Sequence, residues 1–158
     1  MARLEHYQNP AAPKADSIVV EVAAFVLDAD GRLLMVRRSV NDHLYALPGG
    51  VQEVGETVSV AAVRRTAAET GVDIAVSGLI GVYSDPEHVV EFSGGAVRQE
   101  FSVCFRGRPI GGELRTSADG NVEVLWVDRS LLPELTIHPS VRLRIQHGFD
   151  ERAGSYFA

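Results

Sequence analysis

The sequence of 158 residues contains one cysteine, Cys104, and one lysine, Lys14. A single cysteine excludes an internal disulfide framework and a cysteine zinc site. Cys104 lies in the apolar run FSVCF, so we expect it to be a small buried hydrophobic residue. Nearly all positive charge is therefore carried by arginine.

Positive side chains are also fewer than negative ones, because 15 lysines and arginines face 21 aspartates and glutamates, which gives a formal net charge of −6. Binding to a nucleic-acid backbone needs a basic face, so we expect no nucleic-acid polymer as a partner. The N-terminal residues contain no apolar run long enough for a signal peptide or a membrane span. We therefore expect no membrane association and a cytoplasmic location. A small phosphorylated substrate needs only a local basic pocket and remains compatible with this charge.

The composition fits one globular domain, with 46% hydrophobic and 23% charged residues. Residues 1–16 are polar and rich in alanine and proline, which predicts a flexible N-terminal arm. We expect a single domain over residues 17–150 and a C-terminal tail over residues 151–158.

Stretches rich in β-branched residues predict strands at residues 17–28, 32–38, 73–85, 97–108 and 122–128. The turn at residues 28–31 makes the first two of these strands a hairpin. Residues 86–96 are expected to form a long loop or a hairpin tip. Helices are predicted at 57–70 and 139–149, with a short helical turn at 130–135. This order indicates an α/β or α+β domain in which helices pack on a mixed sheet.

In the first predicted helix, Val60, Val63 and Ala67 recur at helical spacing and are expected to form its buried face. Thr57 or Ser59 can cap its start, and Gly71 suits the position just past its end.

This helix follows a glycine-rich loop in the stretch GGVQEVGETVSVAAVRRTAAETGV, residues 49–72. Cleavage of a pyrophosphate link needs divalent cations, which prefer oxygen ligands that converge on one point. A helix supplies such ligands at positions i, i+3 and i+4, which share one face. The corresponding positions here are 65, 68 and 69.

The spacing resembles the Nudix box, G-x5-E-x7-R-E-U-x-E-E-x-G-U, at Gly50, Glu56, Arg64, Glu69, Gly71 and Val72. The resemblance extends over about residues 17–147. It implies an α/β/α sandwich with a central mixed sheet. It also implies a hydrolase that cleaves the pyrophosphate link of a nucleoside diphosphate derivative, with Mg²⁺ or Mn²⁺ as cofactor.

The helix departs from the box at three positions. Arg65 and Ala68 occupy the places of two glutamates, and Thr66 replaces a bulky apolar residue. Only Glu69 remains of the three helix glutamates, so we expect a weakened or unusual metal site. Arg65 can pair with Glu69, and its guanidinium can also bind phosphate directly. A merely solvated helix residue is the alternative interpretation of Arg65.

Carried over residue by residue, the resemblance assigns catalytic roles to Glu69, Arg64 and Glu56, with Arg64 and Glu56 paired to hold the loop on the helix. Gly50, Arg65 and Arg37 are the predicted substrate-binding residues. The predicted metal ligands are Glu69, Glu53 and Glu123.

Several other polar and aromatic residues receive less specific interpretations. The carboxylates of Glu87, Glu91 and Glu100 are expected at the surface, although any of them can supplement a metal site. His88 and His138 are expected to be unrelated loop residues. The aromatic residues that can either stack on a base or pack in the core are Tyr45, Tyr83 and Phe92.

Two further functions stay open. A catalytically degenerate Nudix domain can bind a nucleotide or sugar-diphosphate ligand as a sensor or regulator, and a protein-interaction domain can keep only the scaffold. The box does not identify the substrate, which loops such as residues 84–96 are expected to read. The sequence leaves a homodimer open.

Overall fold

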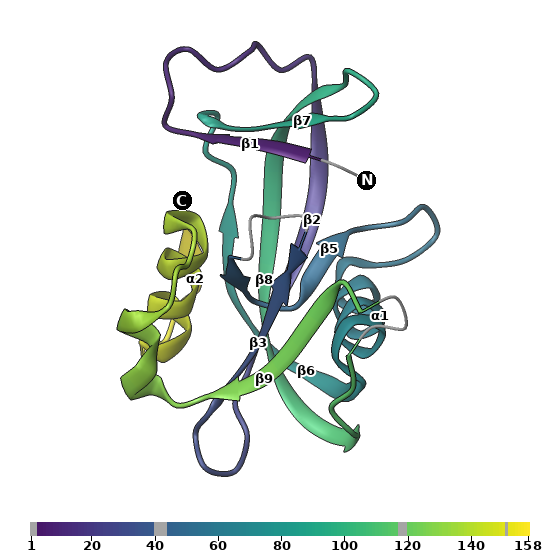
Figure 1. Cartoon of the computed structure of the whole chain (residues 1–158), viewed down its shortest axis with the longest axis vertical. Helices are drawn as coiled ribbons and strands as arrows, with labels where there is room; N and C mark the ends of the chain where they lie inside the picture. The colour runs from purple at the N-terminus through teal and green to yellow at the C-terminus, as the bar shows by residue number, and fades with distance from the viewer. Residues whose placement is uncertain (1–2, 40–43, 117–119, 151) are drawn as a thin grey trace.

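The computed structural model describes residues 3–39, 44–116, 120–150 and 152–158, and its helices lie on opposite sides of two β-sheets (Figure 1). The strands are β1 (Arg3–Tyr7), β2 (Ser17–Val26), β3 (Leu33–Arg38), β4 (Tyr45–Ala46), β5 (Gly49–Val51), β6 (Val72–Tyr83), β7 (His88–Phe92), β8 (Val97–Gly112), β9 (Val122–Val127) and β10 (Tyr156–Phe157). The helices are α1 (Val58–Thr70), the 3₁₀ turn η2 (Arg129–Glu134) and α2 (Pro139–Phe149).

The larger sheet is mixed and is organised around the long strand β8. One edge of β8 pairs in parallel with β2, and the other edge pairs antiparallel with β7 and then with β6. The sheet is extended by β1 on β7, by β5 on β2 and by β10 on β6. Strands β4, β3 and β9 form a separate antiparallel sheet. The predicted mixed sheet is confirmed.

Apolar side chains join each helix to the sheets. On the α1 side, Ala61 and Ala62 pack against Val22, Val103 and Phe105 of the larger sheet. On the α2 side, a cluster built around Phe25 includes Ile145, and the Phe149 ring meets the Phe25 ring edge-on. The predicted sandwich of helix, sheet and helix is confirmed (Figure 1).

Helix α1 has the predicted caps but not the predicted buried face. The Thr57 hydroxyl accepts a hydrogen bond from the Val60 N–H at 3.2 Å, and Gly71 ends the helix with φ at 78°. Val60, however, is 52% exposed, and the buried residues are Ala61, Ala62, Thr66, Glu69 and Thr70. The buried threonine hydroxyls donate to backbone carbonyls four residues earlier, which satisfies them without solvent. Small residues thus let the helix lie close to the sheet.

The predicted hairpin of residues 17–28 and 32–38 is wrong beyond its turn. Strands β2 and β3 meet only at an isolated bridge between Leu27 and Leu33. On one edge β2 pairs with β8 along its whole length, and on the other edge Glu21–Ala23 pair with β5 and the Ala24 N–H donates to the Pro48 carbonyl. Strand β3 instead pairs with β4 and β9 in the second sheet.

The prediction of a flexible N-terminal arm is also wrong for Arg3–Tyr7, because these residues form strand β1, which pairs with β7. Residues 88–92, inside the predicted loop or hairpin tip, form β7 and turn back into β8, which supports the hairpin. The segments SVNDHL (39–44) and SADGN (117–121), whose residue types favour a loop and a turn, lie largely outside the described residues. Within the described residues, neither helix has the length and apolar character that a membrane crossing requires.

Candidate active site

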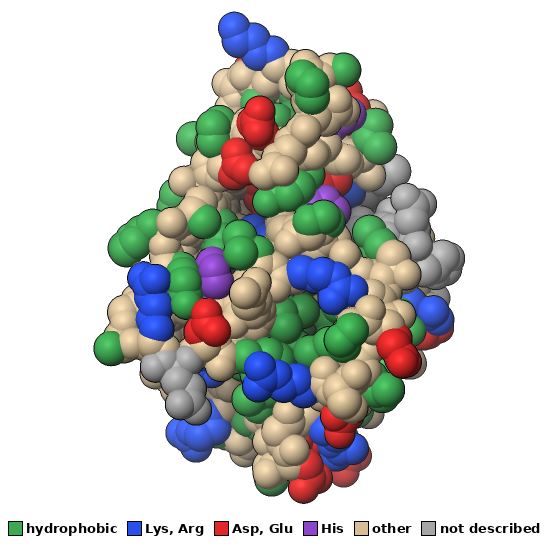
Figure 2. Space-filling model, turned by 90° about the vertical axis from the view of Figure 1, so that its left-hand side faces the viewer, with side chains coloured by type: hydrophobic (Ala, Val, Ile, Leu, Met, Phe, Trp, Pro, Cys, Tyr) green, Lys and Arg blue, Asp and Glu red, His purple; other side chains and the backbone are tan. Residues whose placement is uncertain are grey.

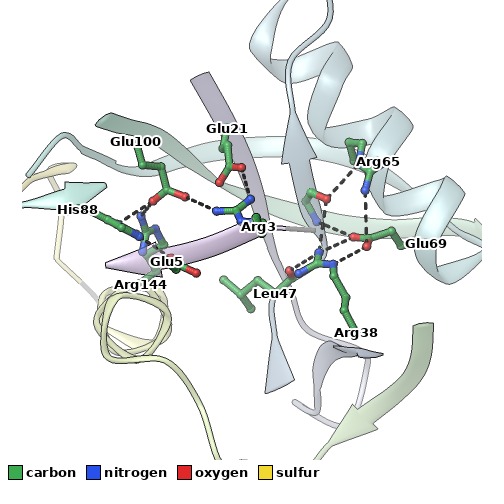
Figure 3. Close-up of polar contacts among 11 residues, drawn as sticks. Arg3, Glu5, Glu21, Arg38, Leu47, Arg65, Glu69, His88, Glu100 and Arg144 are labelled. Atoms are coloured by element: carbon green, nitrogen blue, oxygen red, sulfur yellow. Dashed lines mark hydrogen bonds and ion pairs between the residues drawn. The ribbon is translucent and has the colours of Figure 1, made fainter. Parts of the chain in front are cut away.

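Glu69 lies at the centre of a group of hydrogen-bond donors beneath the glycine-rich loop. Arg38, at the end of β3, donates from Nε to Glu69 Oε2 and from Nη2 to Oε1, both at 2.6 Å. The Gly49 N–H adds a bond to Oε1 at 3.0 Å, and Arg65 Nη2 lies 3.6 Å from Oε2 (Figure 3). Glu69 is 5% exposed, so these donors replace water around its carboxylate.

Arg65 joins the helix to the loop on the same side. Its Nε donates to the Gly49 carbonyl at 3.0 Å, and its guanidinium covers Gly50. A Cβ added to Gly50 would lie 2.4 Å from Arg65 Nε, so the close approach depends on glycine at this position. Residues 49 and 50 are therefore brought together with Arg65 and Glu69, as the motif predicts.

The predicted pair of Arg64 and Glu56 is confirmed. Arg64 Nη2 donates to Glu56 Oε1 at 2.6 Å and Arg64 Nε donates to Oε2 at 2.9 Å. These bonds, with the Glu53 backbone N–H, lower the pKa of Glu56 to about 2. The side chain of Glu53 lies in the same loop, 3.7 Å from Arg64 Nη1. This pairing fastens the loop to the middle of α1.

Two predicted site residues, Arg37 and Glu123, lie away from this centre. Arg37 Nη2 donates to both oxygens of Glu123 at 2.6–2.7 Å, across the β3–β9 pair. Successive side chains of a strand point to opposite faces, so Arg38 meets Glu69 on one face and Arg37 meets Glu123 on the other. The arginine that reaches the box helix is thus Arg38. Strand alternation was the signal in the sequence that could have separated the two.

The donor set on the helix does not fit a divalent ion in this arrangement. Magnesium needs several oxygen ligands. The structure offers one helix carboxylate, whose oxygens already accept bonds from Arg38 and Gly49. Arg65 adds a second positive charge beside it, and Glu53 and Glu123 are paired with other arginines.

The centre opens into a cavity of about 340 Å³. Its walls include Arg38, Gly50 and Arg65 near the box helix, and Tyr45 and Phe92. Further wall residues come from a second polar group, drawn on the other side of Figure 3. A cavity of this size lies in the range of small-ligand sites. Over the face drawn in Figure 2, basic and acidic side chains alternate and form no continuous basic surface.

The second group is a buried ionic cluster of six residues from β1, β2, β7, β8 and α2: Arg3, Glu5, Glu21, His88, Glu100 and Arg144. Glu100 is its centre, with His88 Nδ1 at 2.9 Å, Arg144 Nη2 at 3.3 Å and Arg3 Nη2 at 3.7 Å. Arg3 Nη1 donates to Glu21 at 2.6 Å, and His88 Nε2 meets Glu5. Glu100 is 6% exposed, so its predicted place at the surface is wrong.

The charges of the buried ionic cluster are set by burial and by the neighbouring groups. Burial opposes protonation of His88, but its bonds to Glu100 and Glu5 outweigh burial and raise its pKa to about 9. Burial and the Glu100 carboxylate raise the pKa of Glu21 to about 8. Burial also disfavours ionisation of Glu100, but bonds with Glu21 and His88 outweigh it and lower its pKa. At neutral pH the cluster therefore holds a protonated imidazole.

Ligand atoms of Glu5, His88 and Glu100 lie within 4.8 Å of one another, a spacing that a metal ion can bridge. Each nitrogen of His88, however, faces a different carboxylate, so neither is free to ligate a metal. Arg3 and Arg144 also bring positive charge to Glu100. We therefore interpret the cluster as an ion-pair network.

Sequence reasoning missed the relation between His88 and His138. Their rings stack at 5.6 Å, and Tyr7 packs edge-on against both. Of the three aromatic candidates, Tyr83 belongs to the core, whereas Tyr45 and Phe92 line the cavity. Cys104 is buried as predicted, and burial raises the pKa of its thiol to about 12.

Comparisons with known proteins provide evidence for the family of this chain. A family model described as NUDIX domain matches residues 18–145. The chain is 36% identical over 117 residues to an ADP-ribose pyrophosphatase from Methanocaldococcus jannaschii, a match that covers 70% of this chain and 62% of that protein. It is 37% identical over 108 residues to a MutT-like protein from Streptomyces ambofaciens, covering 68% and 62%. The chain thus spans about three fifths of the length of these curated relatives.

A solved structure shares the fold. The crystal structure of an ADP-ribose pyrophosphatase from Streptococcus suis superposes with a TM-score of 0.65, covering 89% of this chain and 98% of that chain. The identity between the two is 19%, so this similarity concerns the fold alone.

Proposed function

The chain belongs to the Nudix family, and from that premise we propose that it is a pyrophosphohydrolase that acts on a nucleoside diphosphate derivative. One observation carries the proposal: the Gly50 loop and the guanidinium of Arg65 line one cavity, and the buried Glu69 lies directly behind them, bonded to the Gly49 N–H and 3.6 Å from Arg65. The relatives named ADP-ribose pyrophosphatase and MutT-like protein support the same class of reaction.

In this proposal the diphosphate binds beside Gly50, where the absence of a side chain leaves the backbone accessible. Arg65 and Arg38 supply guanidinium groups, which bind phosphate oxygens in pairs. Glu56 and Arg64 act as positioning residues, because they hold the loop without facing the cavity. Glu69 is the proposed catalytic carboxylate. Once a phosphate draws Arg38 away from it, Glu69 accepts a proton from the water that attacks phosphorus, and the bridging P–O bond breaks so that the other phosphate leaves with the bridging oxygen.

The cofactor prediction of Mg²⁺ or Mn²⁺ stays a prediction. Because the helix donor set does not fit a divalent ion as arranged here, we assign no step of the reaction to one. The predicted domain span of 17–150, a homodimer and a cytoplasmic location also stay predictions.

A second candidate function is a binding domain that holds a nucleotide or sugar diphosphate without cleaving it. The specific observation in its favour is the occupation of Glu69 by Arg38, together with Arg65 and Ala68 at two glutamate positions of the box. In this case the ligand stabilises the fold but is not consumed.

Turnover of a panel of nucleoside diphosphate derivatives tests the two candidates, with magnesium, with manganese and with chelator. The hydrolase predicts release of a nucleoside monophosphate, lost in Glu69→Gln and retained in Glu123→Gln, which changes an outward-facing carboxylate. No turnover in any condition, with a ligand-induced rise in melting temperature, would instead support the binding domain.

A further inference from the structure

Strand β1 lies outside the residues that match the family model, yet it forms part of the cavity wall. The match begins at residue 18, whereas β1 comprises Arg3–Tyr7. Among the described strands β1 pairs only with β7, in the register Arg3 opposite Phe92 to Tyr7 opposite His88. This pairing brings Arg3 and Glu5 into the same cavity as Arg38 and Arg65.

Arg3, Glu21, Glu100 and Phe92 belong to the far wall of the cavity, which is the wall away from α1. The contacts of Arg3 fix the carboxyl groups of Glu21 and Glu100 at this wall. Its Nη1 lies 2.6 Å from Glu21 and its Nη2 lies 3.7 Å from Glu100, both of which are more than nine-tenths buried. The guanidinium carbon also lies over the Phe92 ring, 5.8 Å from its centroid, which adds a cation–π contact to these ion pairs. Arg3 supplies positive charge to the buried Glu100 carboxylate and donates a hydrogen bond to Glu21, and both groups lose a partner without it, so the shape of this wall depends on Arg3.

The far wall differs chemically from the wall at the box helix. Near the helix the cavity presents Arg38, Arg65 and the glycine backbone, which suit phosphate oxygens. At the far wall it presents carboxyl groups beside the Arg3 guanidinium, and the ring of Phe92. Carboxylates accept hydrogen bonds from hydroxyl groups and guanidinium donates to them, so this wall suits a sugar.

We propose that β1 is the specificity element of the cavity and that Arg3 is a specificity-determining residue. In this proposal the wall built by Arg3 and Glu21 receives the sugar that is linked to the diphosphate. The inference rests on the proposed function only in that the diphosphate itself binds at Arg38 and Arg65.

The test compares the affinities of ADP and ADP-ribose, because the two ligands share the diphosphate and differ in the terminal sugar. Titration calorimetry measures both on the full chain carrying Glu69→Gln, which prevents turnover of the ligand during the titration, and each Arg3 variant is made in the same background. We expect Arg3→Met, which removes the charge and keeps the length, to weaken ADP-ribose binding about tenfold, as loss of a charged hydrogen bond does. ADP affinity should stay within about twofold, which is less than one such bond contributes.

Arg98→Met is the matched control. Arg98 lies over the same Phe92 ring, 5.6 Å from its centroid, but it is exposed and is not part of the cavity wall. This variant should leave both affinities unchanged. Arg3→Lys keeps a positive charge beside Glu21 and Glu100 but loses the forked geometry, so it should show a smaller loss of ADP-ribose affinity.

The possible outcomes separate the two proposals. Equal weakening of ADP and ADP-ribose in both Arg3 variants, or no weakening of either, would overturn the specificity role of Arg3 without contradicting the proposed function. If the wild-type chain binds neither ligand, the proposed function itself is contradicted and this inference with it.

Discussion

Arg37 and Arg38 are neighbours in β3 whose ion pairs differ in environment. Arg38 holds Glu69, whose side chain is 6% exposed, whereas Arg37 holds Glu123, whose side chain is 58% exposed. Water screens the exposed pair of Arg37 and Glu123 and can hydrate either group when the pair breaks, whereas it is largely excluded from the pair of Arg38 and Glu69. The same residue type, one position apart, therefore has different energetic roles.

Arg38→Ala should lower the free energy of unfolding by about 3 kcal/mol, because it leaves Glu69 buried without its main cation. Urea denaturation measures the loss. Arg37→Ala is the matched control and should cause a much smaller loss. Equal losses in the two variants would mean that burial does not increase the contribution of the Arg38–Glu69 pair to the free energy of unfolding.

Restoring the two helix carboxylates should create a metal site. In Arg65→Glu combined with Ala68→Glu, one positive charge is removed and two oxygen-ligand groups are added next to Glu69. We expect Mn²⁺ to raise the melting temperature of this variant and to leave the wild-type chain unchanged. Arg65→Gln combined with Ala68→Gln has similar volume without charge, and an equal response there would contradict the explanation.

At the scale of elements, the end of α1 is determined by Gly71. Its φ of 78° is left-handed, and a Cβ there would lie 2.1 Å from the Glu113 carbonyl oxygen. The tight connection holds the C-terminal end of the helix against the segment after β8. Glycine is therefore required for both conformation and space.

Gly71→Ala should lower the free energy of unfolding by about 3 kcal/mol, since strain and a backbone clash add. Gly55→Ala isolates the first contribution, because Gly55 also has a positive φ, 93°, but faces open space. We expect a loss of about 1 kcal/mol there, measured in the same denaturation experiment. If Gly71→Ala lowers the free energy of unfolding no more than Gly55→Ala does, the helix end tolerates a side chain and the proposed backbone clash is contradicted.

At the scale of the whole molecule, the buried ionic cluster ties the N-terminal strand to the larger sheet and to α2. His88 on β7 faces Glu5 of β1 and Glu100 of β8, stacks on His138, and lies near Arg144 of α2 through their shared partner Glu100. Its raised pKa means that the folded state binds the proton more tightly than the unfolded state. Stability from this group is therefore complete below its ordinary pKa and is lost at high pH.

The free energy of unfolding should fall as the pH rises from 6.5 to about 9, the ordinary and folded pKa values of His88. The loss is on the order of 2–3 kcal/mol. Glu21, whose pKa is raised to about 8, contributes in the same direction. His88→Gln should flatten the upper part of this dependence in a series of denaturation curves. An unchanged slope in that variant would show that His88 is not the titrating group.

The sequence by itself determined the features that depend on short separations along the chain. The caps of α1 follow from the residue types at its ends, and the pair of Glu56 and Arg64 spans 8 positions. Glu56, Arg64 and the C-terminal cap Gly71 are fixed positions of the box. Their arrangement follows from their spacing, because the loop and the helix are continuous in the chain. Most predicted strands are confirmed for the same reason, since β-branched runs favour extended backbone locally.

Only the tertiary structure decided which distant residues meet. Arg38 and Glu69 are 31 positions apart, and Glu5 and His88 are 83 apart. Which of two neighbouring arginines reaches Glu69 depends on the register and orientation of β3, because one residue of shift moves a side chain to the opposite face. The role of β1 depends on the pairing edge that β7 leaves free. Strand pairing joins backbone groups that every residue type carries, so side-chain identity along the chain does not specify the partner.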